Sequence, residues 1–294
     1  MSWEDTFQAW AKLPGETEQT KCDNVERAIK KAVDADKNLS DRKVTTFRHG
    51  SYHNRTNIRM DSDVDVGVLC TETIFFDLPD GMNAADFDLT VPASYQYPEY
   101  KDDVERALNS HFGDGSVTRG NKAFDVHENT NRVDADAIAC FEYRRYYKDG
   151  TYRQGVAFNT DRGARIINYP QQNYDNGVKK NDATDRRFKA VVRILKRLFG
   201  AMGEESVAAA AGIPGFLIEC LAWNVPNDGF GHDTLAADVR WALAHLFNNT
   251  RNANSCKEWA EINGYKYLFH SSQPWTWEQA HAFTSAAWDY LGFK

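Results

Sequence analysis

The 294-residue chain has few of the features that mark secreted, membrane-bound or zinc-binding proteins. Its five cysteines lie far apart without a CxxC pair, and its eight histidines show no metal-ligand spacing, so a disulfide framework and a Cys/His metal site are both disfavoured. No apolar run approaches the roughly 18 residues that a membrane span requires. The first residues also lack the basic and apolar regions of a signal peptide. We therefore expect a cytoplasmic protein with reduced, mostly buried thiols and no membrane partner.

An excess of positive charge is also absent, because the formal net charge is -7. A protein that coats nucleic acid without specificity needs clustered cations, so this class is disfavoured, although a local basic pocket for a small anion remains compatible with the charge. Hydrophobic residues make up 42% of the chain and aromatic residues 13%, which is enough for a packed core. The length allows one large domain or two modest ones.

Hydrophobic periodicity divides the chain into two halves. Helical spacing predicts a long amphipathic helix from about Glu18 to Asp36 and a second helix that ends near Gly113. Strand patterns occupy Thr45–Arg48 and much of the segment Val117–Phe158, where Asp149–Gly150 is a typical hairpin turn.

Residues 171–185 form a polar stretch, and the chain beyond it is mainly helical in pattern. Helices are expected over residues 188–199, 214–223, 234–247 and 276–291. The pattern predicts an α+β fold with a mixed-sheet lobe over residues 1–170 and a helical lobe over residues 171–294.

The most informative segment is His49-Gly50-Ser51-Tyr52, which is followed after a short spacer by an acidic strand over residues 61–69. Side chains alternate along a strand, so Asp63 and Asp65 project from one face while the intervening valines pack on the other. Two neighbouring carboxylates repel each other, and a strand disfavours aspartate. A bound divalent cation would compensate for this cost. Mg²⁺ commonly uses one or two carboxylates and completes its coordination with substrate phosphates, which indicates nucleotidyl transfer.

A two-metal displacement needs a third carboxylate, and Asp136 is the natural candidate because it lies in the middle of a strand. Two Mg²⁺ or Mn²⁺ ions held by Asp63, Asp65 and Asp136 would clamp the attacking hydroxyl and the leaving pyrophosphate. Asp134 lies on the same face as Asp136, so the choice between them stays open at this point. The alternative is that these acids form surface ion pairs with lysine or arginine at a sheet edge.

A calcium-binding EF-hand is a rival interpretation of the same acids. Asp61, Asp63, Asp65 and Glu72 occupy acidic positions of such a loop. The loop requires glycine at its sixth position, where this chain has Val66 in a strand context. The EF-hand is therefore rejected.

Two further features suit a phosphate-bearing substrate. Gly50 and Ser51 can bring backbone N–H groups and a hydroxyl close to triphosphate oxygens, although a Gly-Ser pair is also an ordinary turn. The segment 185–197 is a basic helix in which Arg193, Lys196 and Arg197 lie about one turn apart. Such a face can bind phosphate oxygens, and the alternative for any single member is a solvated helix surface.

These motifs together resemble the cGAS/DncV-like nucleotidyltransferases (CD-NTases) of the polymerase-β-like superfamily. The likeness covers almost the whole chain and is strongest at Gly50-Ser51 and Asp63-Val64-Asp65. Residues 133–140 look like the family's third-aspartate strand, residues 188–198 like its basic spine helix and residues 213–221 like its later Pro-Ser-Phe-Leu-Leu-Glu helix. Two departures are Ala139, where proline is common, and Gly215, where serine is usual.

The resemblance implies a two-lobed enzyme that makes cyclic di- or trinucleotide signals from NTPs for bacterial anti-phage (CBASS-type) defence through a downstream effector. It selects Asp136 as the metal ligand and gives Lys196 a contact with the donor triphosphate. Activation by DNA is not expected, since the chain has no zinc module and no strongly basic platform. The rivals are a nucleotidyltransferase that modifies a protein, an antibiotic or a tRNA end, and an inactive nucleotide-binding module.

Asn168 is the candidate for base selection. It ends a predicted strand at the junction of the two lobes, and its amide can pair with the N3–H and O4 edge of uracil. Some family members that accept pyrimidines resemble this chain in having an asparagine at a comparable place, which implies UTP as a substrate. The alternative role of Asn168 is to cap the turn before Pro170.

Overall fold

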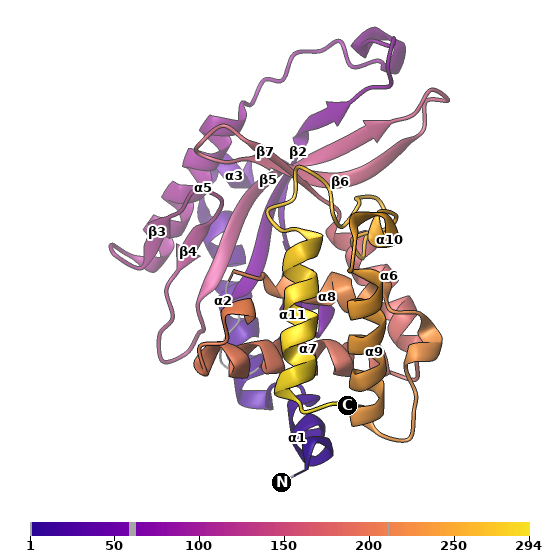
Figure 1. Cartoon of the computed structure of the whole chain (residues 1–294). Helices are drawn as coiled ribbons and strands as arrows, with labels where there is room; N and C mark the ends of the chain where they lie inside the picture. Colours follow the sequence, from indigo (N-terminus) through magenta and orange to yellow (C-terminus); the bar gives the residue numbers. More distant parts are fainter. Residues whose placement is uncertain (1, 59–62, 211) are drawn as a thin grey trace. The chain divides into compact units, whose positions relative to one another are not determined.

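The computed structural model describes residues 2–58, 63–210 and 212–294 (Figure 1). The contacts within the chain divide it into two compact units. A helical unit contains the described residues of 1–14, 53–61 and 171–294, and a sheet unit contains those of 15–52 and 62–170. Residues 1–14 thus belong with the helices, and the functional division of the chain at residue 170 stays a prediction.

The helices of the described residues are α1 (Trp3–Trp10), α2 (Glu16–Ala35), α3 (Lys37–Ser40), α4 (Gly50–Asn54), α5 (Tyr97–Phe112), α6 (Pro170–Ala183), α7 (Arg187–Glu204), α8 (Gly215–Asn224), α9 (Leu235–Asn249), α10 (Ala253–Cys256) and α11 (Trp277–Tyr290). The strands are β1 (Val44–Arg48), β2 (Val64–Asp77), β3 (Val117–Arg119), β4 (Phe124–Val126), β5 (Ala135–Tyr146), β6 (Tyr152–Asn159) and β7 (Arg165–Asn168).

The sheet unit is built on one mixed sheet, in which the described strands have the order β1-β2-β5-β4-β3. Strand β2 runs parallel to β5, whereas β4 pairs antiparallel with the first part of β5 and β6 with its second part. The side chains of Val64, Val66 and Val68 are fully buried in a core shared with α2 and α5. Because strand side chains alternate, this packing turns the intervening aspartates to the opposite face of the sheet.

The predicted elements of this unit are confirmed within a few residues. The long helix is α2, and the second helix is α5, which ends before Gly113 as its C-cap. The hairpin turn lies between β5 and β6, where Gly150 adopts a φ of +84° and the Tyr147 N–H bonds to the Thr151 carbonyl at 2.8 Å.

The helical unit packs around α7. The apolar stripe of this helix, which includes Phe188, Val192 and Leu195, is fully buried against α8, α9 and α11. The predicted helices correspond to α7, α8, α9 and α11.

The polar stretch over residues 171–185 is mostly helix α6, which the hydrophobic pattern did not predict. Its polar side chains bind other elements of the same unit: Lys180 donates to the Val225 carbonyl at 2.7 Å and Asn176 to the Ile262 carbonyl at 2.7 Å. This helix therefore depends on tertiary hydrogen bonds more than on an apolar face, and periodicity cannot detect such a helix.

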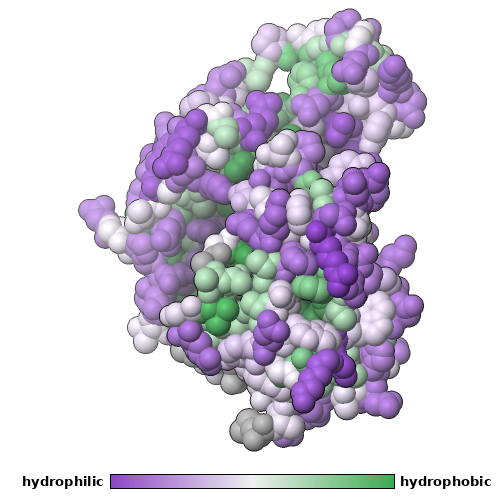
Figure 2. All heavy atoms as spheres, in the orientation of Figure 1, coloured by the Kyte–Doolittle hydropathy of each residue, from purple (hydrophilic) through white to green (hydrophobic). Residues whose placement is uncertain are grey.

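The five cysteines are free and buried, as predicted. In the described part of the chain no helix is both long enough and apolar enough to span a membrane. The face drawn in Figure 2 is mostly hydrophilic, with hydrophobic residues gathered in smaller areas.

Candidate active site

Three neighbouring strands place aspartates in one row across the sheet. In the strand register, Asp65 of β2 lies opposite Asp136 of β5, and Asp136 lies opposite Asp125 of β4. Residues in register on adjacent strands point to the same face, with the strands about 4.8 Å apart. Asp63 directly precedes β2 and shares that face by alternation. The structure therefore brings together the three predicted carboxylates and adds Asp125.

Asp125 was missed by the sequence analysis. Its strand β4 has only three residues, too few to show an alternating pattern, and its pairing with β5 is not visible in the sequence. The pairing of β4 beside β5 is what brings this carboxylate into the row.

The row is strongly electronegative. Burial raises the pKa of Asp136 to about 6, with further contributions from the charges of Asp63 and Asp125. Burial likewise raises the pKa of Asp63, together with the charges of Asp134 and Asp125. The charges that shift these two groups are all acidic, so the surface ion pair with lysine or arginine is rejected for both. Within the described residues neither Asp63 nor Asp136 forms an ion pair, and clustered carboxylate oxygens of this kind suit a hard divalent metal ion.

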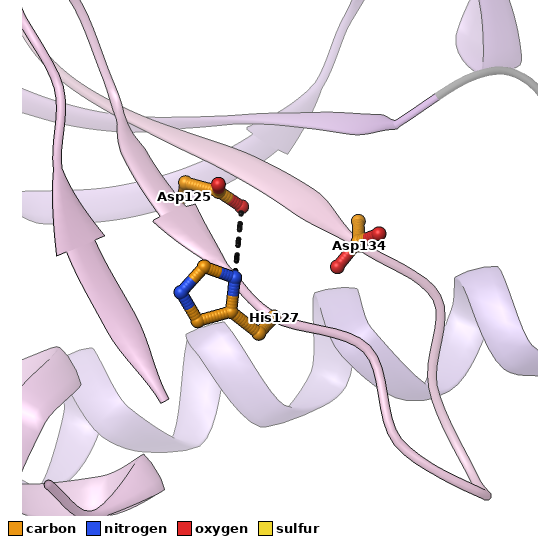
Figure 3. A group of neighbouring side chains, drawn as sticks. All are labelled: Asp125, His127 and Asp134. Carbon is orange, nitrogen blue, oxygen red and sulfur yellow. Dashed lines mark ion pairs between the residues drawn. The ribbon is translucent and has the colours of Figure 1, made fainter. Parts of the chain in front are cut away.

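Asp134 lies near Asp63 and Asp125, as Asp136 does, but it also makes a hydrogen bond of its own to the preceding loop. Its Oδ1 accepts a hydrogen bond from the Glu128 N–H at 2.6 Å, which closes the loop before β5. Ligand atoms of Asp134, Asp125 and His127 lie within 4.8 Å of one another (Figure 3). His127 Nδ1 is 3.6 Å from Asp125 Oδ1, and its Nε2 is 2.9 Å from Thr118 Oγ1. The register with Asp65 favours Asp136 as the third carboxylate, while Asp134 supports the loop.

Gly50 packs directly against Asp65. Gly50 has a φ of +68°, and a Cβ atom at this position would lie 1.7 Å from Asp65 Oδ2. Only glycine combines the left-handed backbone with so close an approach. The His49 N–H also donates to the Asp65 carbonyl at 3.1 Å. Gly50 and Ser51 begin the short helix α4 rather than a simple turn, and Asp61 of the rejected EF-hand lies outside the described residues.

Lys196 of α7 belongs to the helical unit and is buried. Its Nζ lies 2.5 Å from Glu219 Oε1 of α8, and both side chains are less than 10% exposed. The second carboxylate oxygen of Glu219 has no hydrogen-bond partner among the described residues. A Cβ atom on Gly215 would lie 3.6 Å from Lys196 Nζ, so the position where serine is usual in the family adjoins this lysine. Glu219 was not predicted as a site residue because its pairing with Lys196 joins two helices.

The solvated-surface interpretation of the basic helix is wrong for Lys196 and also for Arg193. Arg193 is 9% exposed and donates to the carbonyls of Ala11 and Arg55, at 2.6 Å each. Arg197, in contrast, is only partly buried.

Asn168 is the last residue of β7 and pairs with Val156 of β6. Together with His49 and Cys140 it lines a cavity of about 20 Å³, which is room for one water molecule. Among the described residues the Asn168 amide makes no side-chain hydrogen bond, so the capping role has no support from the contacts.

A mixed sheet that presents a row of aspartates beside a Gly-Ser helix start defines a nucleotidyltransferase of the polymerase-β-like fold. Residues 175–292 match the family model of the cGAS/DncV-like nucleotidyltransferase C-terminal helical domain. The chain is 41% identical to a cyclic dipyrimidine nucleotide synthase CdnE of Cecembia lonarensis, over 99% of this chain and 98% of the relative. It is 42% identical to a CdnE of the same description from Legionella pneumophila, with the same two coverages.

A solved structure of a Rhodothermus marinus CdnE c-UMP-AMP synthase, with Apcpp and Upnpp, matches with a TM-score of 0.86. Its sequence is 28% identical, and the match covers 98% of this chain and 96% of that chain. The chain therefore belongs to the cGAS/DncV-like nucleotidyltransferases. It is an enzyme of the cyclic nucleotide synthase class, and metal-dependent catalysis is general in this family. The predicted family, fold and enzyme class are confirmed.

Proposed function

We propose that this enzyme joins two or three NTPs, at least one of them UTP, into a cyclic nucleotide by a two-Mg²⁺ in-line mechanism. The row formed by Asp65, Asp136 and Asp125, with Asp63 beside it, carries this proposal. Support for pyrimidine substrates comes from the two relatives described as cyclic dipyrimidine nucleotide synthases and from the Asn168 amide, which makes no side-chain hydrogen bond to any residue that the structure describes.

Asp63, Asp65 and Asp136 would hold the metal ions, because their oxygen ligands match what Mg²⁺ prefers and no cation of the described part of the chain neutralises Asp63 or Asp136. When bound there, the ions would neutralise the negative charge of the attacking hydroxyl and of the leaving pyrophosphate. Gly50 keeps the start of α4 close to Asp65, and the Ser51 hydroxyl and the backbone N–H groups there would bind the donor phosphates. Lys196 would provide a charge for the same triphosphate.

The function is tested by incubating the purified chain with radiolabelled NTPs, singly and in pairs, with Mg²⁺. We expect a phosphatase-resistant product that requires UTP and that EDTA abolishes. Transfer of label to a protein, an antibiotic or a tRNA end would support the rival nucleotidyltransferases, and no product under any condition would support an inactive module.

A substitution at Asn168 tests base selection. Asn168→Ser removes the amide donor that can pair with uracil O4. We therefore expect the ratio of UTP to purine-nucleotide incorporation to fall by roughly tenfold, which corresponds to the loss of about one to two hydrogen bonds. The ratio of labelled products from equimolar NTP mixtures measures the shift. Incorporation of ATP and GTP alone by both proteins would remove Asn168 from the base site.

Ser51→Ala tests the phosphate role of α4. The loss of a hydroxyl bound to a charged phosphate costs roughly 1.5–3 kcal/mol, so we expect NTP affinity to fall by about ten- to a hundredfold with little change in the unfolding temperature. Calorimetric titration of a nonhydrolysable UTP analogue measures this affinity, and Ser116→Ala in the same unit is the control. An unchanged affinity would show that Ser51 does not bind the substrate phosphates.

We further propose that the cyclic product acts through a downstream effector protein, that the enzyme works in the cytoplasm and that DNA is not an activator. Equal product yields with and without double-stranded DNA are expected, and a strong dependence on DNA would contradict the last point.

A further inference from the structure

A basic cavity lies within the helical unit, apart from the residues assigned above to catalysis. It has a volume of about 420 Å³, within the usual range for small-ligand pockets. Its lining combines four cationic residues, one acidic residue and four uncharged ones: Arg55, Arg186, Lys189, Arg193, Asp182, Leu13, Tyr174, Val178 and Asn181.

The buried floor of this cavity is formed by Lys189 and Arg193, which are 8% and 9% exposed. They lie four residues apart on α7 and therefore on the same helix face. Arg193 uses Nε and one terminal nitrogen on the carbonyls of Ala11 and Arg55. These are neutral acceptors, so its positive charge is not balanced by a bound carboxylate.

The positive charge of Lys189 is balanced even less than that of Arg193. Its ammonium group forms no ion pair among the described residues, and its Nζ lies over the ring of Tyr174, 5.6 Å from the centroid. Burial lowers the pKa of Lys189, and the charges of Arg55 and Arg193 lower it further, while Glu219 and Asp182 act in the opposite sense. Burial and the charge of Arg55 lower the pKa of Arg193 to about 10.

Two exposed arginines from separate segments lie at the rim of the cavity. Arg55 directly follows α4, and Arg186 is the N-cap of α7 with a left-handed φ of 65°. Asp185 before it is also left-handed, with a φ of 46°. Two successive non-glycine residues in this conformation are costly, and such strain collects at functional sites. The unusual turn places Arg186 at the cavity.

We propose that this cavity is a binding site for a small phosphate-bearing anion that is distinct from the NTP substrates. Arginine forks and a lysine ammonium match phosphate oxygens, and a ligand with two or more negative charges would neutralise the buried pair. The Tyr174 ring has two neighbours, which are the His53 ring at 4.3 Å between centroids and Lys189 Nζ at 5.6 Å from the ring centroid. The four cationic residues of the lining indicate that the site selects its ligand by negative charge.

Such a ligand would join the segment around Leu13, the end of α4 and the α6–α7 turn, all within the helical unit. Since α4 begins with Gly50 and Ser51, occupancy can alter the mobility of the helix that carries them. Anion binding in this cavity does not depend on which product the enzyme makes.

The test is calorimetric titration of the full chain with pyrophosphate, without divalent metal, at roughly 0.1 M salt. The parent protein and Ser51→Ala, which weakens the proposed NTP phosphate site with little effect on stability, are both expected to bind pyrophosphate, whereas Lys189→Gln and Arg186→Gln weaken binding by tenfold or more. Lys179→Gln removes the same charge from an exposed position of α6 outside the cavity and should bind like the parent. Binding that survives in Lys189→Gln, or that disappears in Ser51→Ala, would overturn the proposal.

Thermal unfolding gives an independent readout in case a variant folds poorly. Without anion, Lys189→Gln should unfold at a higher temperature than the parent, because it removes an unbalanced buried charge. Pyrophosphate should raise the unfolding temperature of the parent and of Lys179→Gln, and not that of Lys189→Gln. An equal rise in all three proteins would show an adventitious effect of the salt and refute the site.

Discussion

Asp136→Asn is expected to lower the rate of cyclic nucleotide formation by about a thousandfold or more. The substitution removes one charge from the carboxylate row while it keeps the size of the side chain. A metal clamp of this kind contributes several kcal/mol to the transition state, and each 1.36 kcal/mol corresponds to a factor of ten. Initial rates with saturating NTPs and Mg²⁺ measure the effect. Asp63→Asn and Asp65→Asn should behave in the same way.

The fold of Asp136→Asn should survive, and the metal-free variant should be more stable than the parent at neutral pH. The pKa of Asp136 in the folded protein, about 6, lies above its ordinary value of 3.8, so the ionised carboxylate destabilises the folded state. The gain from the substitution, roughly 1–2 kcal/mol once solvent screening is allowed for, is full above pH 6 and disappears as the pH falls towards 4. Urea unfolding in EDTA at pH 8 and pH 4 measures this difference.

Asp134→Asn is the matched control, because Asp134 holds the loop through its bond to the Glu128 N–H. It should keep most of the activity. If Asp134→Asn were as inactive as Asp136→Asn, the choice of Asp136 from the strand register would be insufficient. Full activity of Asp136→Asn would refute the two-metal mechanism itself.

The sequence predicted the elements whose patterns are local. Alternation placed Asp63 and Asp65 on one face, and the valines between them are buried as that pattern requires. Asp136 was chosen over Asp134 only through the family resemblance. The structure supplies a physical reason for the choice, which is the register of β2, β5 and β4.

What the sequence could not predict depends on pairing between distant segments. Asp125 lies on a three-residue strand, and Glu219 meets Lys196 across two helices. Helix α6 has no apolar stripe, and its stability rests on polar bonds to residues such as Val225. Each of these features requires knowledge of which elements are neighbours in space, which periodicity does not provide.

Lys196→Ala is expected to weaken NTP binding by about ten- to a hundredfold and also to destabilise the protein. From the family resemblance, this lysine was expected only to contact the donor triphosphate. Its buried pair with Glu219 changes that expectation, because the alanine would leave a carboxylate that is 3% exposed without a partner. Breaking a buried ion pair in this way costs roughly 3–5 kcal/mol. Titration of a nonhydrolysable NTP and urea unfolding measure the two effects separately.

A double substitution distinguishes the two roles of this lysine. Lys196→Met with Glu219→Gln removes both charges and keeps the volume, so most of the lost free energy of unfolding should return. NTP affinity should stay low, because no charge remains for the triphosphate. Arg197→Ala, on the same helix, is the control and should retain NTP affinity close to that of the parent. Recovery of NTP binding in the double variant would show that Lys196 only supports the fold, whereas a loss confined to Arg197→Ala would place the phosphate contact on the neighbouring face of α7.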